Sequence, residues 1–186
     1  MPRRVLLWAL LVAPLAIQLY RYVTESIYYG EILHWTGVHA TNLLLLTLAI
    51  TPLFRIFPRQ KVFVWLRRYR RDLGLVTFSY SAVHAVVYLV RLADGPRILE
   101  EAIEPGMLTG WLAMAVFLVL ALTSNDLSVR ALGRTWGRLH KSVYVAAILT
   151  MAHWVLTAFD PTVGYVYLGI LVVLLLPRLV PRRKAA

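Results

Sequence analysis

Residues 138–159, RLHKSVYVAAILTMAHWVLTAF, decide the fold of this chain. No charged residue occurs between Lys141 and Asp160, and an α-helix needs about 20 predominantly apolar residues to cross the roughly 30 Å hydrocarbon core of a membrane. Asp160-Pro161 closes the run, because proline cannot continue the hydrogen-bond ladder of a helix. The stretch therefore predicts a transmembrane helix that ends in a tight turn.

Five further apolar runs lie on either side of this helix. Of the 186 residues, 60% are hydrophobic and 16% are charged, whereas soluble domains are roughly 45–50% apolar. The runs predict spans at about 5–23, 33–54, 74–92, 107–123 and 161–180, in addition to 138–159. Arg3 and Arg4 before the first run also resemble a signal peptide, but no A-x-A pattern precedes Tyr20, which favours a retained helix. We predict a single domain over residues 1–186, an all-α integral membrane bundle of six transmembrane helices.

Basic residues segregate to alternate segments between the predicted spans. All of the 20 Lys and Arg residues except Arg21, Arg91 and Arg97 fall on one side when the N-terminus is placed inside. An excess of Lys and Arg marks cytoplasmic segments, so both termini are predicted to be cytoplasmic. The net charge of +11 then reflects topology and contact with lipid. No basic groove with interleaved aromatic residues is visible, so no nucleic-acid partner is expected.

The residues able to bind a metal are limited, because the chain has no cysteine. Disulfides, iron–sulfur clusters and haem thiolates are therefore excluded, and any metal must be held by His, Met or carboxylate. Ionisable side chains inside a membrane usually face the bundle interior and act as ligands or relays, although a single buried histidine is often only a hydrogen-bonded ring. All five histidines lie in or beside apolar spans: His34, His39, His84, His140 and His153.

Two of these histidines are predicted at the same depth. His84 lies 13 residues beyond Arg71, and His153 lies 15 residues beyond Arg138, on two spans that run in the same direction. At about 1.5 Å per residue, both sit about 20 Å from the cytoplasmic boundary, on the outer side of the midplane. Imidazole is a standard axial ligand of haem, and bundle cores commonly hold such sites. The spacing predicts one haem iron held between His84 and His153.

His140 is a candidate for a second, inner centre. It lies 13 residues before His153 and hence about 20 Å nearer the cytoplasmic face, but about 140° away around an ideal helix. Either the helix is distorted, or the two sites lie on different flanks. No other histidine is predicted at that level, so a second haem at His140 would need another kind of axial ligand or only one.

The spans contain two further histidines and a pair of glycines whose roles are less clearly indicated by the sequence. His34 and His39 are five residues apart, hence on different faces of one helix, and are candidates for hydrogen-bond donors near the outer haem, proton carriers or interfacial residues. Gly106 and Gly110 match the small-residue spacing of membrane helix packing, a short pattern that also arises by chance.

A transmembrane electron carrier is the favoured function. No nucleotide-binding motif occurs in the sequence, so the electrons must come from another protein or molecule. A stand-alone ferric or quinone reductase remains an alternative, disfavoured because the chain has no dehydrogenase domain. A proton channel or transporter that uses the histidines as relays is disfavoured because the spans lack broken helices. A structural anchor would leave the histidines dispensable.

Several motifs resemble those of the MsrQ family (formerly YedZ), the haem-binding membrane subunits of the bacterial periplasmic methionine sulfoxide reductase system, within the ferric-reductase-like transmembrane group. They occur in the family's order and cover most of residues 30–157. The most specific is residues 132–144, LGRTWGRLHKSVY. The others are His34-Trp-Thr-Gly37, Thr51-Pro-Leu-Phe-Arg55, Arg70-Arg-Asp-Leu-Gly-Leu75 with His84, and His153-Trp154.

The resemblance implies a multi-pass protein of the bacterial inner membrane that binds b-type haem. Electrons would come from the quinone pool or a cytosolic flavin reductase and pass to a periplasmic molybdopterin reductase of the MsrP type, which repairs oxidised methionine. The chain would be the electron-transfer subunit rather than the catalytic one. His84, His140 and His153 fall on the family's haem-ligand positions, and FMN is associated with the family, although no flavin motif places it here.

The sequence departs from NADPH oxidases and ferric reductases at one point. Those proteins carry a second histidine on the third helix. Here Arg70, Arg71, Arg97 and Ile98 occupy the positions 13 and 14 residues from His84. One haem is therefore expected, with a second left open.

Overall fold

A computed structural model describes residues 2–179, and the side chains of residues 4–176. The described residues contain no strand. The elements are α1 (Pro2–Val23), α2 (Tyr29–Ile56), α3 (Lys61–Arg68), α4 (Arg70–Leu92), α5 (Gly95–Ala102), α6 (Pro105–Leu122), α7 (Asp126–Leu132), α8 (Arg134–Leu139), the 3-10 turn η1 (His140–Ser142), α9 (Val143–Thr157) and α10 (Thr162–Leu179).

The long apolar helices correspond to the predicted spans. Within the described part of the chain, five helical stretches are long and apolar enough to cross a membrane: α1, α2, α4, α6 and the stretch from α8 through α9. Thr162–Leu176 of α10 forms a shorter apolar helix. The predicted all-helical membrane bundle is therefore confirmed. Residue 180, the predicted end of the last span, and the basic residues Arg182, Arg183 and Lys184 lie outside the described residues.

The connecting segments contain three short helices that were not predicted from the sequence, namely α3, α5 and α7. Two begin with a capping side chain. The Asp94 carboxylate accepts a hydrogen bond from the backbone N–H of Arg97 at the start of α5, and the Asn125 side chain accepts one from Ser128 at the start of α7. Such caps satisfy N–H groups that have no partner in the first turn of a helix.

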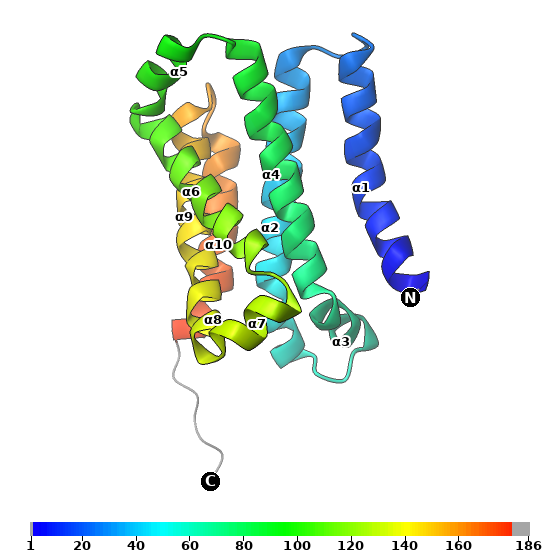
Figure 1. The fold of residues 1–186 in the computed structure, drawn as a ribbon. Coiled ribbons are helices and arrows are strands. Elements are labelled where there is room, and N and C mark those ends of the chain that lie inside the picture. Colours follow the sequence, from blue (N-terminus) through cyan, green and yellow to red (C-terminus); the bar gives the residue numbers. More distant parts are fainter. Residues whose placement is uncertain (1, 180–186) are drawn as a thin grey trace.

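The long helices pack as two pairs that face each other (Figure 1). The pair α2 and α4 contacts the pair α6 and α9 chiefly through α4 and α6, while α10 lies against α9 and α2. Helix α1 lies at the edge of the bundle (Figure 1). We call the two ends the α5 end, which is predicted to face outward, and the α3 end, where α7 and α8 also lie. Both the start of α1 and the end of α10 lie at the α3 end, as an even number of crossings requires.

The largest buried cluster lies where α2, α6, α9 and α10 meet. Leu48, Ala146, Met151 and Leu171 are almost completely buried there, with Phe117 beside them. Threonine hydroxyls in the spans bond to carbonyls one turn earlier along their own helix, as Thr77 does to Leu73 at 2.9 Å. Internal bonds of this kind are required where no water is present to satisfy polar groups.

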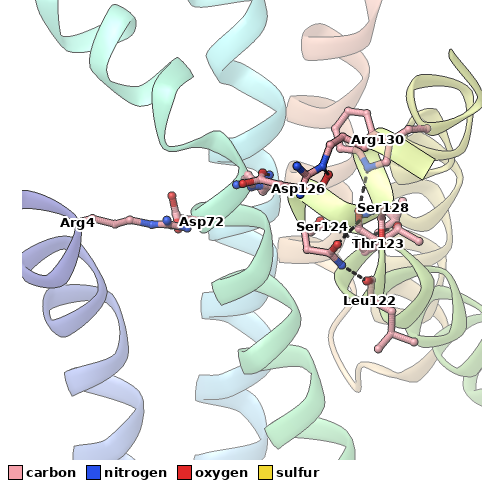
Figure 2. Close-up of polar contacts among 12 residues, drawn as sticks. Arg4, Asp72, Leu122, Thr123, Ser124, Asp126, Ser128 and Arg130 are labelled. Carbon is pink, nitrogen blue, oxygen red and sulfur yellow. Dashed lines mark hydrogen bonds and ion pairs between the residues drawn. The ribbon is translucent and has the colours of Figure 1, made fainter. Parts of the chain in front are cut away.

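Helix α1 is fixed to the bundle by a polar contact at the α3 end. Figure 2 shows Arg4 reaching from α1 to Asp72 at the start of α4. Asp72 Oδ1 accepts hydrogen bonds from Arg4 Nε and Trp8 Nε1, each at 2.9 Å. On the side of α4 away from α1, Arg71 pairs with Asp126 at 2.6 Å, but that carboxylate is 77% exposed. The carboxylate of Asp72 is buried, at 6% exposed, and that of Asp126 is not.

We expect Asp72→Ala to lower the stability of the protein by about 1–3 kcal/mol, because it leaves the Trp8 N–H and the Arg4 guanidinium without their shared acceptor. The loss is smaller than for a fully buried pair, since the Arg4 side chain is 53% exposed and screened by solvent. Thermal unfolding in detergent measures the change. Asp126→Ala is the matched control, with an expected loss of about 0–1 kcal/mol. Equal melting temperatures for the two variants would contradict the prediction.

Candidate functional site

The structure brings His84 of α4 and His153 of α9 together inside the bundle. Their ring centroids lie 6.3 Å apart, and the ring planes are perpendicular. His84 Nδ1 lies 3.0 Å from the carbonyl oxygen of Leu33 on α2, and His153 Nδ1 lies 2.8 Å from the carbonyl oxygen of Gly106 on α6. A carbonyl only accepts hydrogen bonds, so Nδ1 carries the proton in both rings and Nε2 keeps a free lone pair.

This separation suits two imidazoles that share one metal ion. Two imidazoles that held one metal ion through Nε2, with bonds of about 2.0–2.1 Å, would have ring centroids about 6 Å apart, close to the 6.3 Å found here. A ligating histidine typically donates its other N–H to a carbonyl, which fixes the orientation of the ring and raises its basicity. Both histidines have that arrangement.

Two glycines allow the neighbouring helices to approach these rings. A Cβ atom on Gly37 of α2 would lie 3.2 Å from His84 Cε1 and Nδ1. A Cβ atom on Gly110 of α6 would lie 2.7 Å from His153 Nδ1, closer than such atoms can approach without movement. In the sequence, Gly110 is recognisable only as part of a packing motif, and nothing marks Gly37 as a neighbour of the histidines.

A cavity of about 420 Å³ surrounds the pair, within the 300–1,000 Å³ typical of cofactor sites. Its wall comes mainly from α2, α4, α6 and α9 and is largely apolar, with a few polar groups. The lining includes Leu33, His34, Gly37, Thr41, Ser81, His84, Tyr88, Met107, Gly110, Trp111, Met114, Phe117, Thr150, His153 and Trp154. The shape and composition suit a mostly apolar group that reaches both histidines.

The donor set suits a metal that brings ligands of its own. No group of three or more His, Cys, Asp or Glu side chains that could hold a bare metal ion occurs among the described residues. An iron porphyrin needs only the two axial positions, which imidazoles commonly fill. The indole Nε1 of Trp111 is also buried without a hydrogen-bond partner in the described part of the chain. Because Trp111 lines the cavity, the residues present fit a haem with a polar edge.

His140 lies in a different environment, towards the α3 end. It occupies the 3-10 turn η1, so the helical stretch predicted over 138–159 is distorted at this residue. Its ring stacks on Trp136 at 3.9 Å, and its Nε2 lies 3.1 Å from Thr123 Oγ1, at the start of the turn shown in Figure 2. The structure does not bring His140 together with the His84–His153 pair.

The two remaining histidines diverge as their spacing predicted. His34 lines the cavity. The His39 ring instead stacks on Trp35 at 3.8 Å and has Tyr80 as its next aromatic neighbour, while His39 Nδ1 lies 2.8 Å from the Trp35 carbonyl oxygen. His39 is therefore held by a hydrogen bond outside the cavity.

A polar cluster lies at the rim of the cavity on the α5 end. The Tyr88 hydroxyl donates a hydrogen bond to Glu101 Oε2 at 2.6 Å, and Arg97 Nε donates one to Glu101 Oε1 at 2.8 Å. The bond from Tyr88, and to a smaller extent the bond from Arg97, holds the pKa of Glu101 below its usual value. Glu101 therefore stays ionised at neutral pH and links α5 to the cavity wall.

The sequence of this chain is similar to those of known membrane proteins. The sequence matches the family described as the ferric reductase like transmembrane component over residues 36–151, which include His84 and His140 and stop two residues before His153. It is 42% identical over 150 residues to a protein of Xanthomonas campestris pv. campestris (strain B100) named "Protein-methionine-sulfoxide reductase heme-binding subunit MsrQ". That match covers 78% of this chain and 67% of the relative.

A protein of the same name from Brucella ovis is 37% identical over 151 residues, which cover 78% of this chain and 66% of that protein. A third, from Xanthomonas axonopodis pv. citri, is 42% identical over 150 residues, with 78% of this chain and 67% of the relative covered. No solved structure gives a significant match.

Proposed function

This chain belongs to the ferric reductase-like transmembrane family, within its MsrQ group, and we propose that it holds one haem b between His84 and His153 and carries electrons across the bacterial inner membrane. One observation carries the proposal. The two imidazole rings lie 6.3 Å apart and perpendicular, each with its Nδ1 bonded to a carbonyl of the neighbouring helix. A histidine held in a helix core only by its Nδ1 hydrogen bond does not need a second histidine ring 6.3 Å away in the same cavity.

Each surrounding group has a defined part in this proposal. When bound, the haem supplies an iron that accepts and releases one electron at a time. The carbonyl oxygens of Leu33 and Gly106 fix the ring orientations, and Gly37 and Gly110 leave room for both rings. The apolar wall limits access of water. A c-type haem is excluded because its covalent attachment would need cysteine, which the chain lacks, and a b-type haem held without covalent bonds is the one proposed.

The relatives' names support the destination of the electrons. We propose that they pass to a methionine sulfoxide reductase at the predicted outer face, a periplasmic molybdopterin enzyme of the MsrP type. His153 lies only four residues from the end of α9 at the α5 end, so the site is nearer that face. Reduction of one sulfoxide to methionine and water consumes two electrons and two protons, so two electrons must pass in succession. The quinone pool or a cytosolic flavin reductase is the proposed donor.

The cofactor content of the purified protein decides whether His140 holds a second haem and whether FMN is bound. A second haem at His140 predicts two haems per chain, with one lost in His140→Ala. One haem per chain, retained in that variant, restricts the site to His84 and His153. FMN is tested in the same preparation by its absorption and fluorescence.

The proposal predicts sharp b-type absorption bands for the purified, reduced protein. The reduced protein should then be reoxidised by a MsrP-type reductase only when methionine sulfoxide is present. Absence of haem bands would refute the proposal. Reoxidation by a soluble ferric chelate, with none by the reductase and sulfoxide, would establish the stand-alone ferric reductase instead.

A further inference from the structure

The indole N–H of Trp111 is the starting point, because it is a strong donor with no acceptor. It is buried without a hydrogen-bond partner, the one such side-chain atom among the described residues. Trp111 lines the cavity around His84 and His153. A buried donor that remains unpaired is costly, so an acceptor from outside the chain is expected at this position.

The indole lies on the α5-end side of the histidine pair. Trp111 follows Gly110, which abuts His153, and side chains on a helix lean towards its N-terminus, which for α6 is the α5 end. The Trp111 ring contacts the Tyr88 ring, with centroids 6.3 Å apart. Tyr88 is one turn beyond His84, or about 6 Å nearer the α5 end.

The acceptor does not come from the neighbouring polar cluster. The Tyr88 hydroxyl donates to Glu101 Oε2 and Arg97 Nε donates to Glu101 Oε1, but neither carboxylate oxygen accepts a hydrogen bond from Trp111 Nε1. The porphyrin of haem b is apolar except for two propionate carboxylates on one edge. Charged groups are costly inside a membrane, so that edge belongs on the side nearer to water, here the α5 end.

We propose that Trp111 Nε1 donates a hydrogen bond to a propionate carboxylate of the haem, and so orients the haem with its carboxylate edge towards the α5 end. This inference rests on the proposed function, because it takes the haem to be held by His84 and His153. It assigns to Trp111 the role of a positioning residue for the cofactor.

The test compares Trp111→Phe, which keeps an aromatic ring and removes the N–H, with the unaltered protein. The haem dissociation constant should rise about tenfold to a hundredfold, which corresponds to the free energy of a hydrogen bond to a charged group. The propionate bending band in the resonance Raman spectrum should shift as well. Trp154→Phe is the matched control, since Trp154 also lines the cavity but packs against Tyr167, and it should leave the Raman band in place.

A second comparison uses haem whose propionates are converted to methyl esters. The ester removes the charge that strengthens the bond, so Trp111→Phe should then cost much less, as a double-mutant cycle requires for direct contact. The esterified haem should also bind the unaltered protein more weakly, a measurement that needs no variant.

The outcomes separate this inference from the proposed function. If the unaltered protein binds no haem, the proposed function fails first. If it binds haem with two axial histidines, but the ester binds equally well or Trp111→Phe leaves both the dissociation constant and the Raman band unchanged, the role of Trp111 is overturned and the electron carrier stands.

Discussion

Haem absorption should fall to background when either His84 or His153 is replaced by alanine. Each ring would supply one ligand to the iron, and of the other three histidines only His34 lines the cavity. Loss even of a group that only orients a metal ligand typically costs 10–100-fold in metal affinity, so loss of the ligand itself should cost more. Haem-to-protein ratio and the reduced absorption spectrum of each purified variant measure the effect.

His39→Ala is the matched control for this pair. His39 lies in a span and has a carbonyl-bonded Nδ1, as His84 does, but its ring stacks on Trp35 outside the cavity. Its haem content should equal that of the unaltered protein. Full haem content in His84→Ala or His153→Ala would disprove the ligand assignment, provided that both variants are recovered folded from the membrane.

The meeting of His84 and His153 was predictable because the rise of a helix fixes depth. Both residues were counted from a basic boundary on parallel spans, and this count needs no knowledge of packing. The hydrogen bonds that orient the rings could not be predicted. Their acceptors are backbone carbonyls of Leu33 and Gly106, and every residue has such a carbonyl, so no residue type marks them.

The position of His140 shows a different limit. An ideal helix over 138–159 would place His140 and His153 about 140° apart. The 3-10 turn at His140–Ser142 changes that relation, and its geometry depends on contacts with the end of α6, where Thr123 Oγ1 lies 3.1 Å from the His140 ring. Such contacts between segments distant in the sequence are not encoded in the period of one helix.

Trp111 and the short surface helices were missed for related reasons. An apolar span such as 107–123 contains many large residues, and sequence alone does not say which faces a cavity. No helix was predicted between the spans, where polar residues typical of loops occur. The hydrogen bonds of Asp94 and Asn125 to the following backbone instead begin helices there.

Gly110→Ala should remove most of the haem without removing either ligand. The added Cβ would lie 2.7 Å from His153 Nδ1 and 2.9 Å from Cε1, so the ring must move. That ring is not free to move, because its Nδ1 is bonded at 2.8 Å to the carbonyl oxygen of Gly106, which lies one turn before Gly110 on α6. Displacement breaks this bond or tilts Nε2 away from the iron, and either change should lower haem affinity about 10–100-fold.

A graded series of glycine substitutions tests this steric argument. In Gly37→Ala the new Cβ lies 3.2 Å from the His84 ring, so a smaller shift and a smaller loss of haem are expected. In Gly74→Ala nothing lies within 4 Å, and stability should stay equal or rise by about 0.5–1 kcal/mol because alanine favours a helix. Haem content should therefore fall in the order Gly74→Ala, Gly37→Ala, Gly110→Ala. Equal haem content in all three would mean that the histidine rings are not confined by their neighbouring helices, and the close approach of α6 to His153 would then have no part in holding the cofactor.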